Sequence, residues 1–167
     1  MTTVRDQAFD LLRRRGLTTM FANPGSTEVA FLTGLPDDFT FVLGLHEGSV
    51  VGMATGYAIG RREPSLVLLH TTAGLGNAVS ALATARVNRS PLVVLVGQQD
   101  RRHLSYEPFL AGKLAGLGGE YPVKVEQPEV ITDVLDKLVV LLNGSPPPWL
   151  RKALHKGAEV ARNFDEE

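Results

Sequence analysis

The stretch from Ser65 to Val96 reads SLVLLHTTAGLGNAVSALATARVNRSPLVVLV, and it decides the fold. Its two ends, Ser65–His70 and Pro91–Val96, are apolar runs, which are typical of strands covered on both faces of a sheet. Between them, the small residues of about Ala78–Val87 predict a helix. A strand, a helix and a second strand in this order predict two parallel strands joined by a crossover.

The chain before this stretch repeats the same alternation. Hydrophobic periodicity predicts further helices and strands, namely helices at 3–15, 47–61 and a short one ending near Leu32, and strands at 18–22 and 40–44. Ser26 or Thr27 is the predicted N-cap of the short helix. We therefore expect an α/β fold in which a parallel sheet is flanked by helices on both faces.

Beyond residue 100 the pattern loosens. Arg101–Glu120 is predicted to be a long connection or an irregular helix, Val123–Val125 a short strand and Pro128–Leu142 a helix with one apolar face. The run NGSPPP that follows breaks the pattern. We therefore expect one domain over residues 1–142 and a divergent or truncated tail over residues 143–167.

The composition argues against several classes of protein. The chain has 167 residues, of which 44% are hydrophobic and 21% charged, and its net charge is −1. This charge argues against a nucleic-acid binder, and the apolar content argues against a disordered chain. The sequence holds no cysteine, no apolar run as long as a membrane span, and no apolar core of a signal peptide near Met1. We expect a cytoplasmic protein that binds neither nucleic acid nor a membrane.

The predicted helix at 47–61, EGSVVGMATGYAIGR, is unusually rich in small residues. A glycine inside a helix costs roughly 1 kcal/mol relative to alanine. We therefore expect that another backbone or a ligand closely approaches this helix.

Three segments that follow predicted strands carry the candidate functional residues. In parallel sheets, ligands bind at the carboxyl ends of the strands. The segments are Asn23–Ser26, His46–Gly48, and His70 with Ala73–Asn77.

Each candidate has a structural interpretation beside the functional one. Glu47 is either a carboxylate favoured at a helix start or a proton-transfer group in an apolar pocket. His70 is either a core residue or a catalytic group, and Asn23–Gly25 alone is a common turn. Gly74–Gly76 is only half of a dinucleotide-binding fingerprint. The other histidines, at positions 46, 103 and 155, lack the spacing of metal ligands, so no metal site is predicted.

The combination of motifs is more specific than any one of them. NPGS at 23–26, HEGSVVGMATGYA at 46–58, LLHTTAGLGNA at 68–78 and SPLVVLVGQQ at 90–99 together resemble a known family. They are similar to the amino-terminal, pyrimidine-binding domain of thiamine-diphosphate-dependent 2-keto-acid decarboxylases, from about residue 3 to about residue 127. A strand-ending histidine before an A-G-x-G-N-A run is most similar to the benzoylformate decarboxylase branch.

The resemblance implies a cofactor, thiamine diphosphate, and a role for each site residue. Glu47 would hydrogen-bond N1′ of the cofactor's aminopyrimidine, Ser26 would bind the substrate carboxylate, and His70 would donate or accept a proton. The implied cofactor contacts are Glu47, Pro24, Gly25, His70, Gly74 and Asn77, and the implied substrate-pocket residues are Asn23, Ser26 and Leu110.

The resemblance also implies what this chain lacks. Members of the family hold the diphosphate and Mg²⁺ through a Gly-Asp-Gly motif in a later domain, and that motif does not occur in this sequence. We therefore expect a missing domain or a diphosphate-binding partner chain, and a homodimer with the small-residue helix at its interface. The Gly-Pro-Val strand that normally closes the domain is also absent, which predicts an unpaired sheet edge.

Three hypotheses follow for the function. The first is the pyrimidine-binding part of a split or truncated decarboxylase acting on a small 2-keto acid, with an aromatic one favoured by the loops. The second is a non-catalytic binding or regulatory module with the same fold. The third, an unrelated nucleotide-binding protein, rests on Gly74–Gly76 alone.

Overall fold

The computed structural model of the chain describes residues 3–111 and 140–141. Within these residues one sheet has the strand order β2-β1-β3-β4-β5. Neighbouring strands from β2 to β4 are parallel, and β5 is antiparallel to β4. The strands are β1 Thr19–Asn23, β2 Thr40–Leu43, β3 Ser65–Leu69, β4 Leu92–Val96 and β5 Val140–Leu141.

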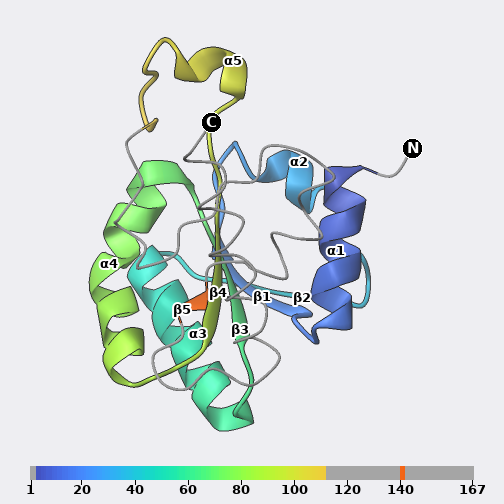
Figure 1. Cartoon of the computed structure of the whole chain (residues 1–167), viewed down its shortest axis with the longest axis vertical. Helices are drawn as coiled ribbons and strands as arrows, with labels where there is room; N and C mark the ends of the chain where they lie inside the picture. Colours follow the sequence, from blue (N-terminus) through green and yellow to red (C-terminus); the bar gives the residue numbers. More distant parts are fainter. Residues whose placement is uncertain (1–2, 112–139, 142–167) are drawn as a thin grey trace, which may run out of the picture.

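Helices lie on both faces of this sheet, which confirms the predicted α/β fold. Figure 1 shows α3 and α4 side by side over one face and α1 over the other. The helices are α1 Val4–Arg14, α2 Val29–Leu32, α3 Glu47–Arg61, α4 Thr71–Val87 and α5 Arg101–Leu104.

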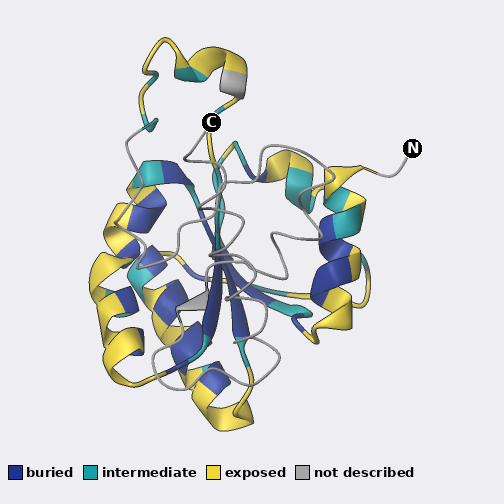
Figure 2. Cartoon of the chain, viewed as in Figure 1, coloured by how far each residue is buried: buried dark blue, intermediate teal, exposed yellow. Residues whose placement is uncertain are grey.

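Two apolar cores stabilise the sheet, one on each face. All five residues of β3 are buried, and Figure 2 shows the dark blue of buried residues concentrated on the central strands. Val67 and Leu69 belong to the core beneath α3 and α4, whereas Leu66 and Leu68 belong to the core beneath α1. This alternation follows from the two-residue period of a strand. Burial of each such side chain contributes roughly 1.5–3 kcal/mol.

The structure corrects the predicted start of α4. The helix begins at Thr71, seven residues before the predicted start at Ala78, so the run of small residues after His70 is helical and not a loop. The N–H of Gly74 donates a hydrogen bond to the carbonyl of His70 at 2.6 Å. Glycines at the start of a helix obscure its periodicity because they carry no side chain, so the hydrophobic pattern becomes visible only further along.

The structure also corrects the predicted cap of α2. Neither Ser26 nor Thr27 caps this helix; Glu28 occupies the N-cap position without a capping hydrogen bond from its side chain. The Glu28 carboxylate instead accepts a hydrogen bond from the N–H of Gly25 at 2.7 Å. The prediction failed because a residue type that commonly caps helices was present one or two positions too early.

The region beyond residue 100 is described only in part. Val140–Leu141 pairs with β4, so the predicted helix over 128–142 is wrong at its end, and this sheet edge of β4 is paired over two residues. The predicted strand at 123–125 and the tail at 143–167 lie outside the described residues. Across the portion that the structure describes, no helix has both the length and the apolar character needed to cross a membrane.

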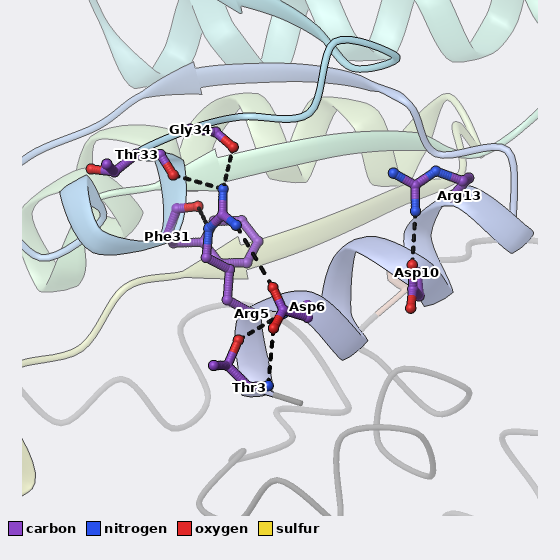
Figure 3. A network of polar contacts seen from close by, with 8 residues as sticks. All are labelled: Thr3, Arg5, Asp6, Asp10, Arg13, Phe31, Thr33 and Gly34. Atoms are coloured by element: carbon purple, nitrogen blue, oxygen red, sulfur yellow. Dashed lines mark hydrogen bonds and ion pairs between the residues drawn. The ribbon is translucent and has the colours of Figure 1, made fainter. Parts of the chain in front are cut away.

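Helix α1 contacts the end of α2, the short helix that follows the loop at residues 23–26. Its first turn has a capping box between Thr3 and Asp6. Figure 3 shows the Arg5 guanidinium donating hydrogen bonds to the last carbonyls of α2 and its turn: Phe31 at 2.8 Å, Thr33 at 2.7 Å and Gly34 at 2.6 Å. These carbonyls lack partners within the helix, so the arginine completes the helix end.

Candidate active site

The strand order brings the predicted site residues to one end of the sheet. Asn23 is the last residue of β1, and its register partner on the adjacent β3 is Leu69. His70 follows Leu69 directly, between β3 and α4, and Glu47 is the first residue of α3. Loops and helix starts at the carboxyl ends of parallel strands are where such folds bind ligands.

Glu47 is a buried carboxylate held by two side-chain amides. It is 7% exposed, its Oε1 accepts a hydrogen bond from Asn23 Nδ2 at 3.1 Å, and its Oε2 accepts one from Asn77 Nδ2 at 3.0 Å. Its position in the first turn of α3 also favours a carboxylate. Each oxygen accepts one hydrogen bond from the described residues and has a second lone pair that can accept one from a ligand.

Gly74 lies between the two titratable candidates. A Cβ added to it would meet Glu47 Cγ and Oε1 at 3.4 Å and the Cβ of His70 at 3.5 Å. The glycine therefore leaves space beside the Glu47 carboxylate. Gly74 and Asn77, predicted as cofactor contacts, both adjoin Glu47, as does Asn23, predicted in the substrate pocket.

The His70 imidazole contacts a second buried carboxylate, which the sequence analysis missed. Its Nδ1 lies 2.8 Å from Glu28 Oε2 and 3.1 Å from Thr27 Oγ1. Glu28 is 2% exposed and His70 17% exposed. The sequence analysis considered its neighbours Ser26 and Thr27 as helix caps and did not consider Glu28.

Gly25 packs against the His70 ring. A Cβ on Gly25 would lie 2.5 Å from three atoms of the imidazole, so only glycine lets the backbone approach this closely. The loop after β1 and the residue that follows β3 are therefore in direct contact.

Thr71, next to His70, has a strained backbone. Its φ is +47°, a left-handed conformation that is costly for a β-branched residue. The side chain is fully buried, and its Oγ1 has no hydrogen-bond partner within the part of the chain that the structure describes. The sequence gives no signal for this conformation.

The remaining predicted residues lie at the rim. Ser26 is exposed in the first loop, and Pro24 is half-buried beside Asn23. Leu110 has a left-handed backbone, φ +74°, and its carbonyl accepts a hydrogen bond from Thr72 Oγ1 at 2.9 Å. That bond ties the segment after α5 to the first turn of α4. Among the described residues, no hydrogen bond joins Ser26 or Leu110 to Glu47.

The motifs at this end of the sheet match those of a protein family. The family model described as thiamine pyrophosphate enzyme, N-terminal TPP-binding domain, matches residues 2–127. This chain belongs to that family. Because the match spans the sheet from β1 to β4, the TPP-binding domain is also the domain that carries Glu47 and His70.

Several members of the family are closely similar to this TPP-binding domain. Benzoylformate decarboxylase of Pseudomonas aeruginosa is 50% identical over 116 residues, which are 70% of this chain and 22% of that protein. A structure of thiamine diphosphate-dependent 4-hydroxybenzoylformate decarboxylase from Rhodococcus jostii RHA1 superposes with a TM-score of 0.72 at 45% identity. The match covers 81% of this chain and 27% of that one.

Benzoylformate decarboxylase from Polynucleobacter necessarius gives a TM-score of 0.65 at 50% identity, over 66% of this chain and 21% of that one. This TPP-binding domain thus spans about a quarter or less of the length of these relatives.

Proposed function

We propose that this chain supplies the pyrimidine-binding half of the active site of a benzoylformate-decarboxylase-like, non-oxidative 2-keto-acid decarboxylase. The observation that carries the proposal is the buried Glu47 carboxylate at the start of α3, held between the amides of Asn23 and Asn77. A carboxyl group whose oxygens are oriented by two amides can form a hydrogen bond with a ring nitrogen of an aminopyrimidine. The cradle also fits the ring, since Gly74 leaves one side of the carboxylate without a side chain.

Each residue then has a part in binding or proton transfer. Bound thiamine diphosphate supplies the electron acceptor for decarboxylation, and the protein tunes and orients it. Glu47 holds a proton at N1′ of the pyrimidine, and the two amides fix the direction of its oxygens. His70 exchanges a proton at the reacting end, and the exposed Ser26 hydroxyl binds the substrate carboxylate. Asn23, Pro24 and Leu110 form the pocket wall, and Gly25 lets the backbone approach the substrate closely.

The other half of the site comes from elsewhere in this proposal. A further domain or a partner chain holds the diphosphate through Mg²⁺. Residues 1–142 form the pyrimidine-binding domain, 143–167 are a separate tail, and the enzyme is a cytoplasmic homodimer. The small-residue face of α3 supports such an interface, because a Cβ on Gly52, Gly56 or Gly60 would meet nothing within 4 Å.

The first test uses the chain alone. Titration calorimetry with thiamine diphosphate and Mg²⁺ should show weak binding, and incubation with benzoylformate should release no carbon dioxide above the buffer rate. Robust turnover by the chain alone would show that no other half is needed.

The second test supplies the missing half. Residues 2–127 replace the matching segment of the Pseudomonas aeruginosa benzoylformate decarboxylase, and the chimera is compared with its Glu47→Gln variant. The chimera should decarboxylate benzoylformate, and Glu47→Gln should lower kcat about 10²-fold or more, the usual contribution of a proton-transfer group. The matched control is Glu63→Gln, an exposed carboxylate that pairs with Arg61. A folded chimera without activity, or equal rates for the two variants, favours the non-catalytic module.

A further inference from the structure

Glu28 makes three hydrogen bonds although its side chain is almost completely buried. Its Oε2 accepts from the N–H of Gly25 at 2.7 Å and lies 2.8 Å from His70 Nδ1, and its Oε1 accepts from the Thr27 hydroxyl. A buried carboxylate is costly unless hydrogen bonds satisfy it. Here the Gly25 N–H and the Thr27 hydroxyl donate to it, and the His70 imidazole is its third partner.

The direction of each bond fixes the proton on His70. The Thr27 hydroxyl has one proton, which it donates to Glu28 Oε1, so its Oγ1 presents only lone pairs to His70 Nδ1 at 3.1 Å. Glu28 Oε2 is likewise an acceptor. Both neighbours of Nδ1 therefore require an N–H there, whether the imidazole is neutral or charged.

We propose that Glu28 is the positioning residue that holds His70 in the Nδ1–H tautomer and thereby makes Nε2 the nitrogen that exchanges protons in the active site. Nδ1 faces the buried carboxylate, and Nε2 has no hydrogen-bond partner among the described residues. Neutral histidine in water prefers the opposite tautomer, so Glu28 changes which nitrogen is basic. A carboxylate that orients a catalytic imidazole acts in the same way in hydrolase triads.

Two glycines show that this arrangement is built into the fold. A Cβ on Gly97 would lie 1.5 Å from Glu28 Oε1 and 2.7 Å from its Cδ, so the residue after β4 leaves room for the carboxylate. A Cβ on Gly25 would lie 2.5 Å from His70 Nδ1, so that glycine leaves room for the ring. Backbone from two different loops therefore encloses the Glu28–His70 pair and restricts rotation of either side chain.

Nitrogen NMR of the 167-residue chain, labelled with ¹⁵N at histidine, tests the tautomer directly. The His70 signals are assigned by their loss in His70→Gln, and the spectrum is recorded at a pH where the ring is neutral. The wild-type chain should show Nδ1 protonated and Nε2 unprotonated. The reverse pattern in the wild-type chain would overturn the proposal without any variant.

Two matched variants separate the acceptor from the bulk of the side chain. Glu28→Met keeps the length but removes both acceptors, which frees the Thr27 hydroxyl to donate to Nδ1. It should shift His70 to the Nε2–H tautomer. Glu28→Gln should keep the Nδ1–H tautomer, since the Gly25 N–H still requires an oxygen at the Oε2 position. An unchanged tautomer in Glu28→Met, or a shifted one in Glu28→Gln, contradicts the assignment.

The catalytic consequence rests on the proposed function and is measured separately. In the chimera, Glu28→Met should lower kcat about 10²-fold while the KM for benzoylformate changes less than about threefold, and Glu28→Gln should recover part of the rate. A kcat for Glu28→Met within about threefold of that of the unsubstituted chimera would deny Glu28 a part in catalysis. The NMR measurement needs no cofactor, so failure of the cofactor to bind leaves it intact, and a wrong tautomer leaves the role of Glu47 intact.

Discussion

The two buried carboxylates at the carboxyl end of the sheet are held by different kinds of partner. Glu47 accepts hydrogen bonds from two asparagine amides, and Asn77 is itself exposed. Glu28 accepts from a backbone N–H, a hydroxyl and the His70 imidazole, and it is enclosed by Gly25 and Gly97. The first carboxylate is open to a ligand, whereas the second is fully used by the protein.

This difference agrees with the two proposed roles, a binding group for Glu47 and a positioning group for Glu28. An amide neither gains nor loses a proton at ordinary pH, so Asn23 and Asn77 orient Glu47 without sharing its proton. The imidazole of His70 has one ring N–H and one ring lone pair when neutral, so Glu28 contacts a group that can both donate and accept a hydrogen bond. Two glutamates of similar burial therefore differ in the groups that hold them.

The largest expected difference between the two carboxylates is the change in the free energy of unfolding when the adjacent glycine is replaced by alanine. Gly97→Ala places a methyl group on Glu28 Oε1, forces the carboxylate out of its three hydrogen bonds and should lower the free energy of unfolding by about 3 kcal/mol. The Cβ of Gly74→Ala would lie 3.4 Å from Glu47, an ordinary contact, and the position is helical. The substitution should therefore raise the free energy of unfolding, by about 1 kcal/mol or less.

Urea denaturation of the two variants beside the wild-type chain measures both effects. The control is Gly56→Ala, an exposed helical position where a Cβ meets nothing, which should stabilise the chain slightly. Similar losses of unfolding free energy for Gly97→Ala and Gly74→Ala would mean that the protein encloses the two carboxylates equally.

The sheet and its main helices could be predicted because their signals are local. The continuous apolar runs at 65–70 and 91–96 identified β3 and β4, and the bounds predicted for α3 are those observed. The start of α4 was wrong because its first turns consist of small residues that bury little apolar surface. The cap of α2 was wrong because Glu28 turns toward a loop that is distant in sequence.

The candidate site could be predicted only at positions where a single residue, by its type and its place after a strand, indicated a function. Glu47 and His70 each follow a strand, so the sequence indicated both. The Glu28–His70 contact joins residues 42 positions apart, and no spacing in the sequence indicates it. The left-handed Thr71 was likewise invisible, since the sequence at that position favours an ordinary extended or helical backbone.

A smaller effect should follow from Arg5, which holds the segment of Glu28 and does not touch Glu47. Arg5→Met removes three hydrogen bonds to carbonyls and a cation–π contact with Phe9, and should cost about 1 kcal/mol. Amide hydrogen exchange should become faster at Gly25, whose N–H donates to Glu28, and stay unchanged at Gly48 near Glu47. Arg14→Met, an exposed position on the same helix, is the control. Faster exchange at both glycines would mean that Arg5 stabilises the surroundings of Glu47 as well as those of Glu28.

The smallest expected effect depends on pH and arises in the first turn of α1, beside Arg5. Hydrogen bonds to the side chain and then the backbone N–H of Thr3 hold the pKa of Asp6 below its usual value. A lowered folded-state pKa means that the stabilisation is complete above the unfolded value of about 3.8 and disappears as the pH falls through the folded one. The difference in Tm between the wild-type chain and Asp6→Asn should therefore be constant near neutral pH and shrink below about pH 4. The asparagine can still accept a hydrogen bond from the Thr3 N–H, so the variant removes the charge alone. In a Thr3→Val background, Asp6→Asn should change Tm by a smaller amount. A difference that grows as the pH falls would contradict a lowered folded-state pKa for Asp6.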